Sequence, residues 1–401
     1  MEKNIKNFMV GEDEGTLRQI AAIANSPSYR DSKIRIMPDA HVGVASCIGF
    51  TATFSDKICP NTVGVDIGCR VSAFEIPYDV DLVKLDQVIN EHIPAGFNVR
   101  ENEHPFSKDF PYEELHCWNY LSKQHRLRLS LGTLGGGNHY IEVNADPLDD
   151  EVFYLVIHSG SRGLGQKVAS YYQELAIQEQ NQRNMEEKIK IHEEMMLLPP
   201  CEREAFLAEK RKEHTEINQD FLYVSGENLE HYLHDVKLCQ EWSLLNHKAI
   251  ADIIAEKMDW IFSCSLPVCT TIHNYVDVEH KIVRKGAISG YYGEIQLIPL
   301  NMRDGVLVVK ALGNEDWNCS LPHGAGRLMS RHEARQKLSL EDYEYEMRNV
   351  CSTSVLMSTI DEAPMAYKDT EQIKSAIGEN AKILGQLYPI YNFKAKGELN
   401  D

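Results

Sequence analysis

Four histidines in short motifs of small, backbone-permissive residues constrain most strongly how this chain can fold. The motifs are GGGNH, HSGSRG, HNY and HGAGR, and their histidines are His139, His158, His273 and His323. An acid and a thiol, Asp66 and Cys69 in VGVDIGC, precede them. Glycine lets the main chain approach a ligand or another backbone closely, and imidazole binds metals or acts as a nucleophile. The pattern therefore predicts one metal-centred site assembled from distant loops.

A site that draws on residues from position 66 to position 323 cannot be divided between independent domains without separating its parts. We therefore predict one catalytic domain over residues 1–401, with an α+β fold of mixed β-sheets and surrounding helices. Runs rich in β-branched and aromatic residues predict strands at 47–54, 71–76, 151–158 and 305–312. Helices are expected at 80–91 and 333–349, and a helical excursion is expected at about 166–260.

Composition limits the partners and the compartment. The net charge of −19, from 60 acidic and 41 basic residues, argues against non-specific binding of polyanions over the whole surface, but allows a local basic groove. No apolar run reaches the roughly 18 residues that span a bilayer, and the first residues lack the apolar core of a signal peptide. We expect a cytoplasmic protein with no membrane contact. Its 10 cysteines form no CxxC pair and are expected to be reduced.

The acid and thiol pair has metal-ligand chemistry. A carboxylate and a thiolate can hold a divalent ion, and a thiolate can bridge two ions. The alternative is a buried cysteine beside an aspartate in a turn. The three glycine-flanked histidines that follow favour the ligand interpretation of Asp66 and Cys69.

Phosphate chemistry is suggested by the loop around His323. Backbone amides ahead of a helix, together with Arg327, suit a phosphate group, and an imidazole there could attack a phosphoryl group. A metal ligand or a helix-start histidine are the alternatives. Positive charge gathers nearby and could offset the global negative charge where an anionic polymer enters. The residues concerned are Lys281, Arg284, Lys285, Arg327, Arg331, Arg335 and Lys337.

The motif order carries a family resemblance. MPDAHVG, VGVDIGC, LGTLGGGNH, HSGSRG, HNY, RKGA, GNE and HGAGR follow one another as in the RtcB family of RNA ligases, which this chain resembles from about Met37 to Arg331 and again at its C-terminal AKG. The resemblance implies the RtcB-like fold and a ligase that joins RNA 2′,3′-cyclic phosphate or 3′-phosphate ends to 5′-hydroxyl ends, in RNA repair or tRNA splicing. It implies GTP and two Mn²⁺ ions as cofactors, and RNA as the partner.

The resemblance also implies roles for single residues. His323 is similar to the histidine that takes GMP before the RNA 3′-phosphate receives it. Asp66, Cys69 and His139 resemble the ligands of one Mn²⁺ ion, and Cys69, His158 and His273 resemble those of the other. The implied nucleotide contacts are Asn138, Glu142, Asn274, Pro299, Met302, Gly324, Ala325, Gly326 and Lys396. Contacts to phosphate or RNA are expected from Arg162, Arg284, Lys285 and Arg327, and Asp39 and His41 lie in a motif near the metal. Cysteine with histidine suits zinc by ligand softness, whereas the resemblance favours manganese.

The chain departs from the family pattern at several positions. A family lysine is replaced by Val44, and Arg70 follows the VGVDIGC motif where glycine is frequent. The nucleotide loop reads PLNMRDG, so that Leu300 and Arg303 replace glycines, and Val306 stands where a serine contacts the base. These changes leave the ligand and nucleophile set complete, and we hypothesise a divergent branch with a specialised RNA repair substrate.

Two other functions fit parts of the pattern. A metal-dependent phosphoesterase acting on RNA ends would use a similar ligand set, but needs no stable adduct on His323. A non-catalytic RNA-binding protein would not be expected to retain every ligand.

Overall fold

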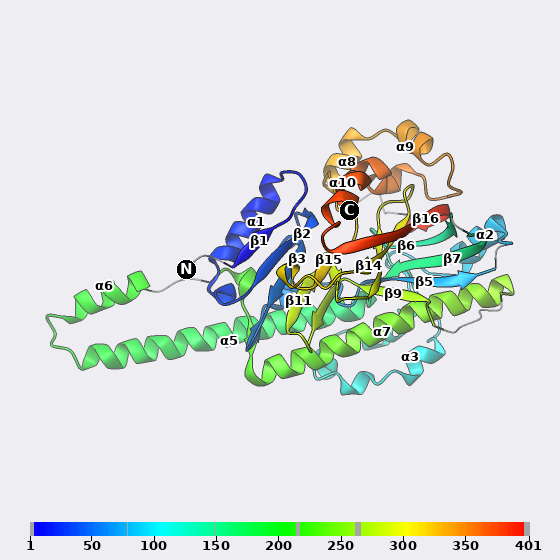
Figure 1. The fold of residues 1–401 in the computed structure, drawn as a ribbon. Coiled ribbons are helices and arrows are strands. Elements are labelled where there is room, and N and C mark those ends of the chain that lie inside the picture. The colour runs from blue at the N-terminus through cyan, green and yellow to red at the C-terminus, as the bar shows by residue number, and fades with distance from the viewer. Residues whose placement is uncertain (1–3, 78, 148, 214–216, 261–265, 397–401) are drawn as a thin grey trace.

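The larger of two main sheets has seven antiparallel strands in the order β13-β14-β16-β6-β7-β5-β9 (Figure 1). The computed structural model describes residues 4–77, 79–147, 149–213, 217–260 and 266–396. The strands of this sheet are β5 (Arg70–Ile76), β6 (Tyr140–Asp146), β7 (Asp149–Ser159), β9 (Cys269–Ile272), β13 (Ile295–Pro299), β14 (Val306–Ala311) and β16 (Ala381–Lys394).

The second sheet has five strands in the order β1-β2-β3-β11-β10, in which only the β1–β2 pair is parallel. Its strands are β1 (Ile5–Asn7), β2 (Ile34–His41), β3 (Ile48–Thr53), β10 (Asn274–Asp277) and β11 (Ile282–Lys285). Two short antiparallel pairs are formed by β12 (Ala287–Ser289) with β15 (Ser320–Pro322), and by β4 (Lys57–Ile58) with β8 (Val224–Ser225). Because only His273 separates β9 from β10, this histidine lies at the junction of the two main sheets.

Two long helices cover one side of the sheets (Figure 1). Helix α7 (Gly226–Met258) contacts α2, α5, β5 and β7, and it buries Trp242 and Ile254 in two different core clusters. Burial of each such side chain is worth roughly 1.5–3 kcal/mol. Helix α5 (Arg162–Met196) buries residues only up to Ala176, and its second half projects from the body together with α6 (Arg203–Glu213).

The remaining helices are short. The α-helices are α1 (Glu14–Asn25), α2 (Leu82–His92), α3 (Pro105–Asp109), α4 (Gln124–Leu129), α8 (Arg331–Lys337), α9 (Leu340–Glu346) and α10 (Thr370–Ala376). The 3₁₀ turns are η1 (Pro27–Tyr29), η2 (Pro60–Thr62), η3 (Tyr112–Glu114), η4 (Trp118–Tyr120), η5 (Gln219–Phe221), η6 (Glu315–Trp317), η7 (Met357–Glu362) and η8 (Pro364–Ala366).

The α+β prediction, with mixed sheets and surrounding helices, is confirmed, and the strands expected at 47–54, 71–76, 151–158 and 305–312 are β3, β5, β7 and β14. The expectation of one helix over 333–349 is wrong. The chain forms α8 and α9 instead, because the side chain of Ser339 accepts the Asp342 backbone N–H at 3.1 Å and starts a second helix.

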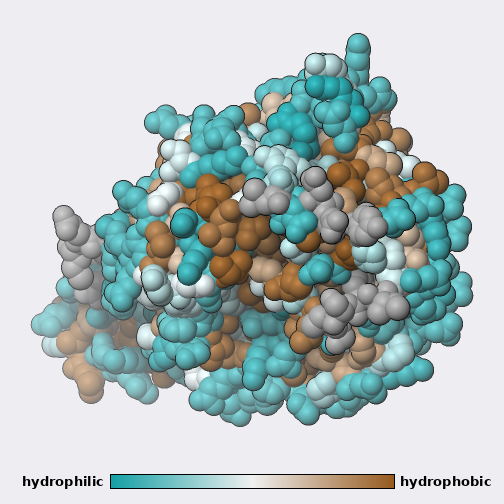
Figure 2. Space-filling model, turned by 45° about the vertical axis from the view of Figure 1, so that its right-hand side comes forward, coloured by the Kyte–Doolittle hydropathy of each residue, from teal (hydrophilic) through white to brown (hydrophobic). Residues whose placement is uncertain are grey.

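The view in Figure 2 shows a largely hydrophilic periphery, with hydrophobic side chains gathered toward the middle of that face. Among the helices of the described ranges, none combines the length and the apolar composition that crossing a membrane requires.

Candidate metal centre and active site

The predicted metal ligands lie at one end of four neighbouring strands. His139 immediately precedes β6, His158 lies near the end of β7, Cys69 precedes β5, and His273 follows β9. The strands are antiparallel, so the start of β6 lies beside the end of β7, and the start of β5 lies beside the end of β9. The register places Tyr140 and Val71 opposite His158. The topology therefore brings side chains from distant motifs together.

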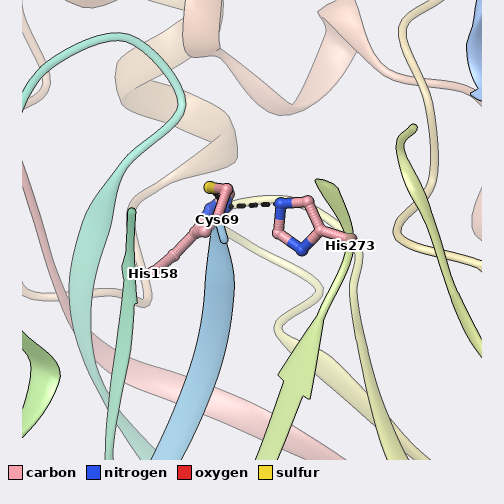
Figure 3. Close-up of side chains that lie close together, drawn as sticks. All are labelled: Cys69, His158 and His273. Carbon is pink, nitrogen blue, oxygen red and sulfur yellow. Dashed lines mark hydrogen bonds between the residues drawn. The ribbon is translucent and has the colours of Figure 1, made fainter. Parts of the chain in front are cut away.

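Figure 3 shows the side chains of Cys69, His158 and His273 turned toward one another. The Sγ atom of Cys69 lies 3.3 Å from the Nε2 atom of His158 and 3.4 Å from that of His139. The Nε2 atoms of His158 and His273 are 3.3 Å apart, and the Nε2 atom of His139 lies 3.0 Å from the Oδ2 atom of Asp66. Two groups that could hold a metal ion result, Asp66–Cys69–His139 and Cys69–His158–His273, and they share the thiol of Cys69.

The donor atoms of this cluster fit metal ions. The Nδ1 atom of His139 lies 3.0 Å from the Leu134 carbonyl oxygen; an N–H there donates to that oxygen and leaves the lone pair of Nε2 facing Asp66 and Cys69. The Nε2 atoms of His158 and His273 face each other at 3.3 Å, and if each neutral ring carries its proton on Nδ1, two lone pairs meet there. The buried Oδ1 atom of Asp66 has no hydrogen-bond partner among the described residues. A cation would relieve both conditions.

Burial sets the charge state of these groups. It lowers the pKa of His158 and of His273 well below the usual value, so both imidazoles are neutral, as metal ligands must be. Burial raises the pKa of the Cys69 thiol well above its usual value, and a positive ion would reverse that effect. For Asp66, burial raises the pKa, but a His139 protonated on both nitrogens would donate its Nε2–H to the carboxylate, and that hydrogen bond and charge outweigh burial and hold the pKa below its usual value.

Two glycines make room for the cluster. A Cβ atom at Gly160 would overlap the carboxylate of Asp66, and one at Gly135 would overlap the guanidinium of Arg162 and approach the ring of His139. Arg162 donates to the Gly96 carbonyl at 2.8 Å and to the Thr133 hydroxyl at 3.2 Å. Any side chain larger than a hydrogen atom at these two positions would therefore collide with the candidate ligands Asp66 and His139 or with Arg162 beside them.

The loop that carries His323 closes onto strand β2. The Nδ1 atom of His323 lies 2.6 Å from the Oδ2 atom of Asp39, which is fully buried, and its backbone N–H donates to the same oxygen at 3.2 Å. The ring centroids of His323 and His273 are 5.0 Å apart. Gly326 has a φ of +75°, and a Cβ atom there would overlap the Asp39 carbonyl. Asp39 thus fixes the ring of His323 beside the metal-ligand cluster.

His41 lies on the same strand as Asp39. Its Nδ1 atom lies 3.0 Å from the Asp39 carbonyl oxygen, and burial lowers its pKa to about 4. It is therefore neutral at pH 7, and it lines the cavity that opens beside His323.

A cavity of about 920 Å³ opens beside His323, within the size range of ligand pockets. Its lining includes most of the expected nucleotide contacts, namely Asn138, Glu142, Pro299, Met302, Gly324, Ala325 and Gly326, and also Arg327. Glu142 accepts hydrogen bonds from the side chains of Asn144 at 3.2 Å and Asn392 at 2.6 Å. Burial raises the pKa of Glu142 to about 7.

Two of the expected phosphate contacts, Arg284 and Lys285, are buried inside the protein. Arg284 is fully buried, and its guanidinium donates to the Ser320 hydroxyl, the Tyr275 hydroxyl and the Asp277 carboxylate, each at 2.8–2.9 Å. Lys285 is also buried, and its ammonium donates to the backbone oxygens of Val44 and Ser46. Both charged groups therefore form hydrogen bonds inside the protein.

Two expected nucleotide contacts do not line the cavity. The side-chain oxygen of Asn274 accepts the Gly286 backbone N–H at 2.9 Å. Lys396 is exposed at the end of the described chain. Lys394, which sequence reasoning missed, lines the cavity and donates to Glu362 at 3.0 Å and to the Asn138 carbonyl at 3.3 Å. Strand alternation places it on the same face of β16 as Asn392, but the same alternation extended to Lys396 does not distinguish the two lysines.

The divergent loop at 299–306 forms the tight turn between β13 and β14. The backbone N–H of Leu300 donates to Gly305, and the Leu300 side chain is buried in the core. Arg303 points outward and pairs with Asp304 and Glu346. Val306 is fully buried in β14. Arg70 likewise turns into the fold, where it donates to Ser243 and to the Gln240 carbonyl.

Comparisons with known proteins bear on what this site does. The profile of the family described as "tRNA-splicing ligase RtcB" matches residues 19–116 and 114–395. The chain is 31% identical over 387 residues to "RNA-splicing ligase RtcB" of Escherichia coli strain K12, covering 88% of this chain and 87% of that protein. It is 25% identical to "RNA-splicing ligase RtcB2" of Escherichia coli strain ATCC 25922, covering 95% of this chain and 92% of that protein. It is 22% identical to "tRNA-splicing ligase RtcB" of Nanoarchaeum equitans, covering 94% of this chain and 91% of that protein. The extent of these matches shows that the chain belongs to the RtcB family.

Proposed function

We propose that the chain is a GTP-dependent RNA ligase that joins a 2′,3′-cyclic phosphate or 3′-phosphate end of RNA to a 5′-hydroxyl end, in RNA repair or tRNA splicing. Membership of the RtcB family supports the reaction class, since the relatives named above are RNA-splicing or tRNA-splicing ligases. The arrangement of His323, Asp39 and the cavity supports the chemistry.

The metal ions are proposed to be two Mn²⁺. Asp66, Cys69 and His139 would hold one ion, and Cys69, His158 and His273 would hold the other, because the two groups meet at one thiol. Ligand softness alone would favour zinc at such sites. Ions bound there would withdraw charge from phosphate oxygens and help to orient them.

The first step is proposed to occur on His323. Asp39 accepts the Nδ1–H, so that the lone pair of Nε2 is available for attack on the α-phosphate of GTP. The Nε2–phosphorus bond forms, the bond between the α- and β-phosphates breaks, and pyrophosphate leaves. Asp39 keeps the ring in the reactive tautomer and stabilises the positive charge that develops on it, as the aspartate of a catalytic triad does.

The nucleotide is proposed to occupy the cavity beside His323. Gly324, Ala325 and Gly326 would contact the phosphates, and Pro299 and Met302 would flank the nucleotide. Glu142 and Asn138 would form hydrogen bonds with the nucleotide, and Lys394, which lines the cavity, is proposed to take the role that the family resemblance implies for Lys396.

Two transfers to RNA would follow. An oxygen of the RNA 3′-phosphate attacks the phosphorus of GMP, and the bond to Nε2 of His323 breaks. The 5′-hydroxyl oxygen of the second RNA end then attacks the 3′-phosphorus, a phosphodiester forms, GMP leaves, and the hydroxyl proton is released. A cyclic phosphate must first be opened by water to a 3′-phosphate. Arg162 and Arg327 are proposed to neutralise phosphate charge near the cluster and the cavity.

The observation that carries this proposal is the fixed imidazole of His323, held by a buried carboxylate at the wall of a nucleotide-sized cavity and in ring contact with a predicted metal ligand. A metal-dependent phosphoesterase would have no need for that arrangement. The test is ligation in Mn²⁺ and GTP of two RNA fragments that carry 2′,3′-cyclic phosphate and 5′-hydroxyl ends. Joined RNA that requires GTP supports the proposal; removal of the terminal phosphate without joining would replace it with hydrolysis.

A further inference from the structure

A third group of metal-ligand side chains lies on the helical side of the molecule and shares no residue with the Cys69 cluster. It consists of His234 and Asp235 in α7 and of His116 in the segment between η3 and η4. We propose that these three residues form a site for a divalent transition-metal ion of the Zn²⁺ class.

The first support is the charge of Asp235. Its side chain is fully buried, and its oxygens accept the backbone N–H of His116 at 2.9 Å, that of Cys117 at 3.1 Å and the hydroxyl of Tyr172 at 2.8 Å. Among the described residues its only ion-pair partner is His234, at 3.3 Å. A buried carboxylate without a permanent positive partner is costly, and a divalent cation would balance it.

The second support is the arrangement of the imidazoles. The ring of His116 stacks on that of His231, with centroids 3.8 Å apart, and lies edge-on to that of His234 at 5.0 Å. The Nε2 atom of His231 instead lies 3.7 Å from Glu227. His231 therefore orients the ring of His116 and is not itself assigned as a ligand.

The distances suit a single ion. The ligand atoms of His116, His234 and Asp235 all lie within 4.8 Å of one another. Two ligands at about 2.0–2.2 Å from a tetrahedral zinc are separated by roughly 3.4 Å. Because His116 and His234 are exposed, side-chain rotation can close the difference without moving the backbone. The 3.3 Å separation between His234 and Asp235 already has the required value.

The chemistry selects the kind of ion. Two imidazoles and one carboxylate, with a position open to solvent, suit Zn²⁺ and its neighbours rather than Ca²⁺ or Mg²⁺, which prefer oxygen ligands. None of the three assigned ligands is a thiolate, which distinguishes the site from the Cys69 cluster. An ion there would join the segment around His116 to helix α7 and stabilise the folded state by binding it selectively.

The test counts ions on the full-length protein. The wild type and the double variant His116→Ala/His234→Ala are dialysed against Zn²⁺ in parallel, and bound zinc is measured by mass spectrometry. We expect one ion fewer per chain in the double variant. His125→Ala, which removes an exposed histidine outside the group, is the matched control and should retain the wild-type content. Equal zinc in the double variant and the wild type would overturn the proposal.

A second measurement separates this site from the Cys69 cluster. In the Cys69→Ala background, Co²⁺ should give visible absorption bands of a nitrogen and oxygen site, without thiolate charge transfer. Adding His116→Ala and His234→Ala should remove these bands; their persistence would assign them elsewhere and refute the site. Both measurements compare variants that differ only at the surface histidines, so that their outcome does not depend on the proposed ligase function.

Discussion

The Nδ1 atom of His323 lies 2.6 Å from the Oδ2 atom of Asp39, a fully buried carboxylate on strand β2 of the five-stranded sheet. This contact joins two motifs that are 284 positions apart in the chain. It determines which nitrogen of the imidazole carries the proton and which can react.

Asp39→Asn should therefore slow the formation of a guanylate adduct on His323 by about 10²-fold or more. The amide N–H of asparagine can donate to Nδ1 and so stabilise the tautomer that carries its proton on Nε2, which cannot attack. The corresponding substitution in a catalytic triad lowers kcat by about 10⁴-fold. The measurement is single-turnover labelling with radioactive GTP. Binding of Mn²⁺ serves as the control and should be unchanged. Labelling at the wild-type rate would show that Asp39 does not orient the nucleophile.

The shared thiol predicts unequal effects of ligand substitutions. Cys69→Ala removes a ligand from both groups and should abolish tight binding of both Mn²⁺ ions, whereas Asp66→Ala should leave the ion held by Cys69, His158 and His273. Electron paramagnetic resonance of free Mn²⁺ during titration measures the number of ions bound. Retention of two ions by Cys69→Ala would mean that the thiol does not bridge them.

Glu142 predicts a specific pH dependence of stability. Its pKa is about 7 in the folded protein, where burial raises it from 4.5. The neutral form is favoured in the folded state, so the stabilisation is complete below about pH 4.5 and is lost as the pH rises through about 7. Relative to Glu142→Gln, the wild type should lose about 3 kcal/mol of unfolding free energy between pH 4.5 and pH 8.

Urea unfolding of both proteins at several pH values, in the presence of a chelator, measures this difference. The glutamine variant shares every other titrating group, so those contributions cancel. A stability difference that stays constant across the range would place the pKa of Glu142 near its ordinary value.

Arg284 is predicted to act on stability and not through direct contact with RNA. Arg284→Ala leaves the Asp277 carboxylate, only 12% exposed, without its ion pair at 2.9 Å, which should cost about 3–5 kcal/mol. Lys337→Ala, which removes an exposed charge of the same basic cluster, should change stability by about 0.5 kcal/mol or less. Chemical denaturation of both variants measures the costs. Wild-type stability of Arg284→Ala with weakened RNA binding would restore the role inferred from sequence.

The sequence predicted the convergence of the ligands because chemistry-bearing residues stand at strand ends. His158 ends an apolar run and Cys69 precedes one, so antiparallel pairing of the two strands places them together. Residue type alone does not predict burial. Arg284 and Lys285 stand in a basic stretch of the sequence, yet both side chains are buried. Only the packed structure shows that Arg284 pairs with Asp277 and that Lys285 donates to the Ser46 carbonyl.

The periodicity of the sequence also did not predict where β16 ends or where α9 begins. Lys394 and Lys396 are two positions apart, and the C-terminal motif favoured Lys396, but β16 ends at Lys394 and, of these two lysines, only Lys394 lines the cavity. The apolar periodicity of the sequence continues across Ser339, but this residue caps the N-terminus of a second helix, α9. The position of Lys394 depends on tertiary packing that periodicity does not contain, whereas the cap at Ser339 is a local contact with Asp342 that the residue types at this spacing could have indicated.

The central claim is that His323 carries GMP covalently. Incubation with α-radiolabelled GTP and Mn²⁺, followed by denaturing electrophoresis, tests it directly. Label should remain on the wild type and be absent from His323→Ala, and it should be lost in acid and kept in alkali, as expected of a phosphoramidate. A wild type that takes no label with any divalent ion, or label that persists in His323→Ala, would contradict the account.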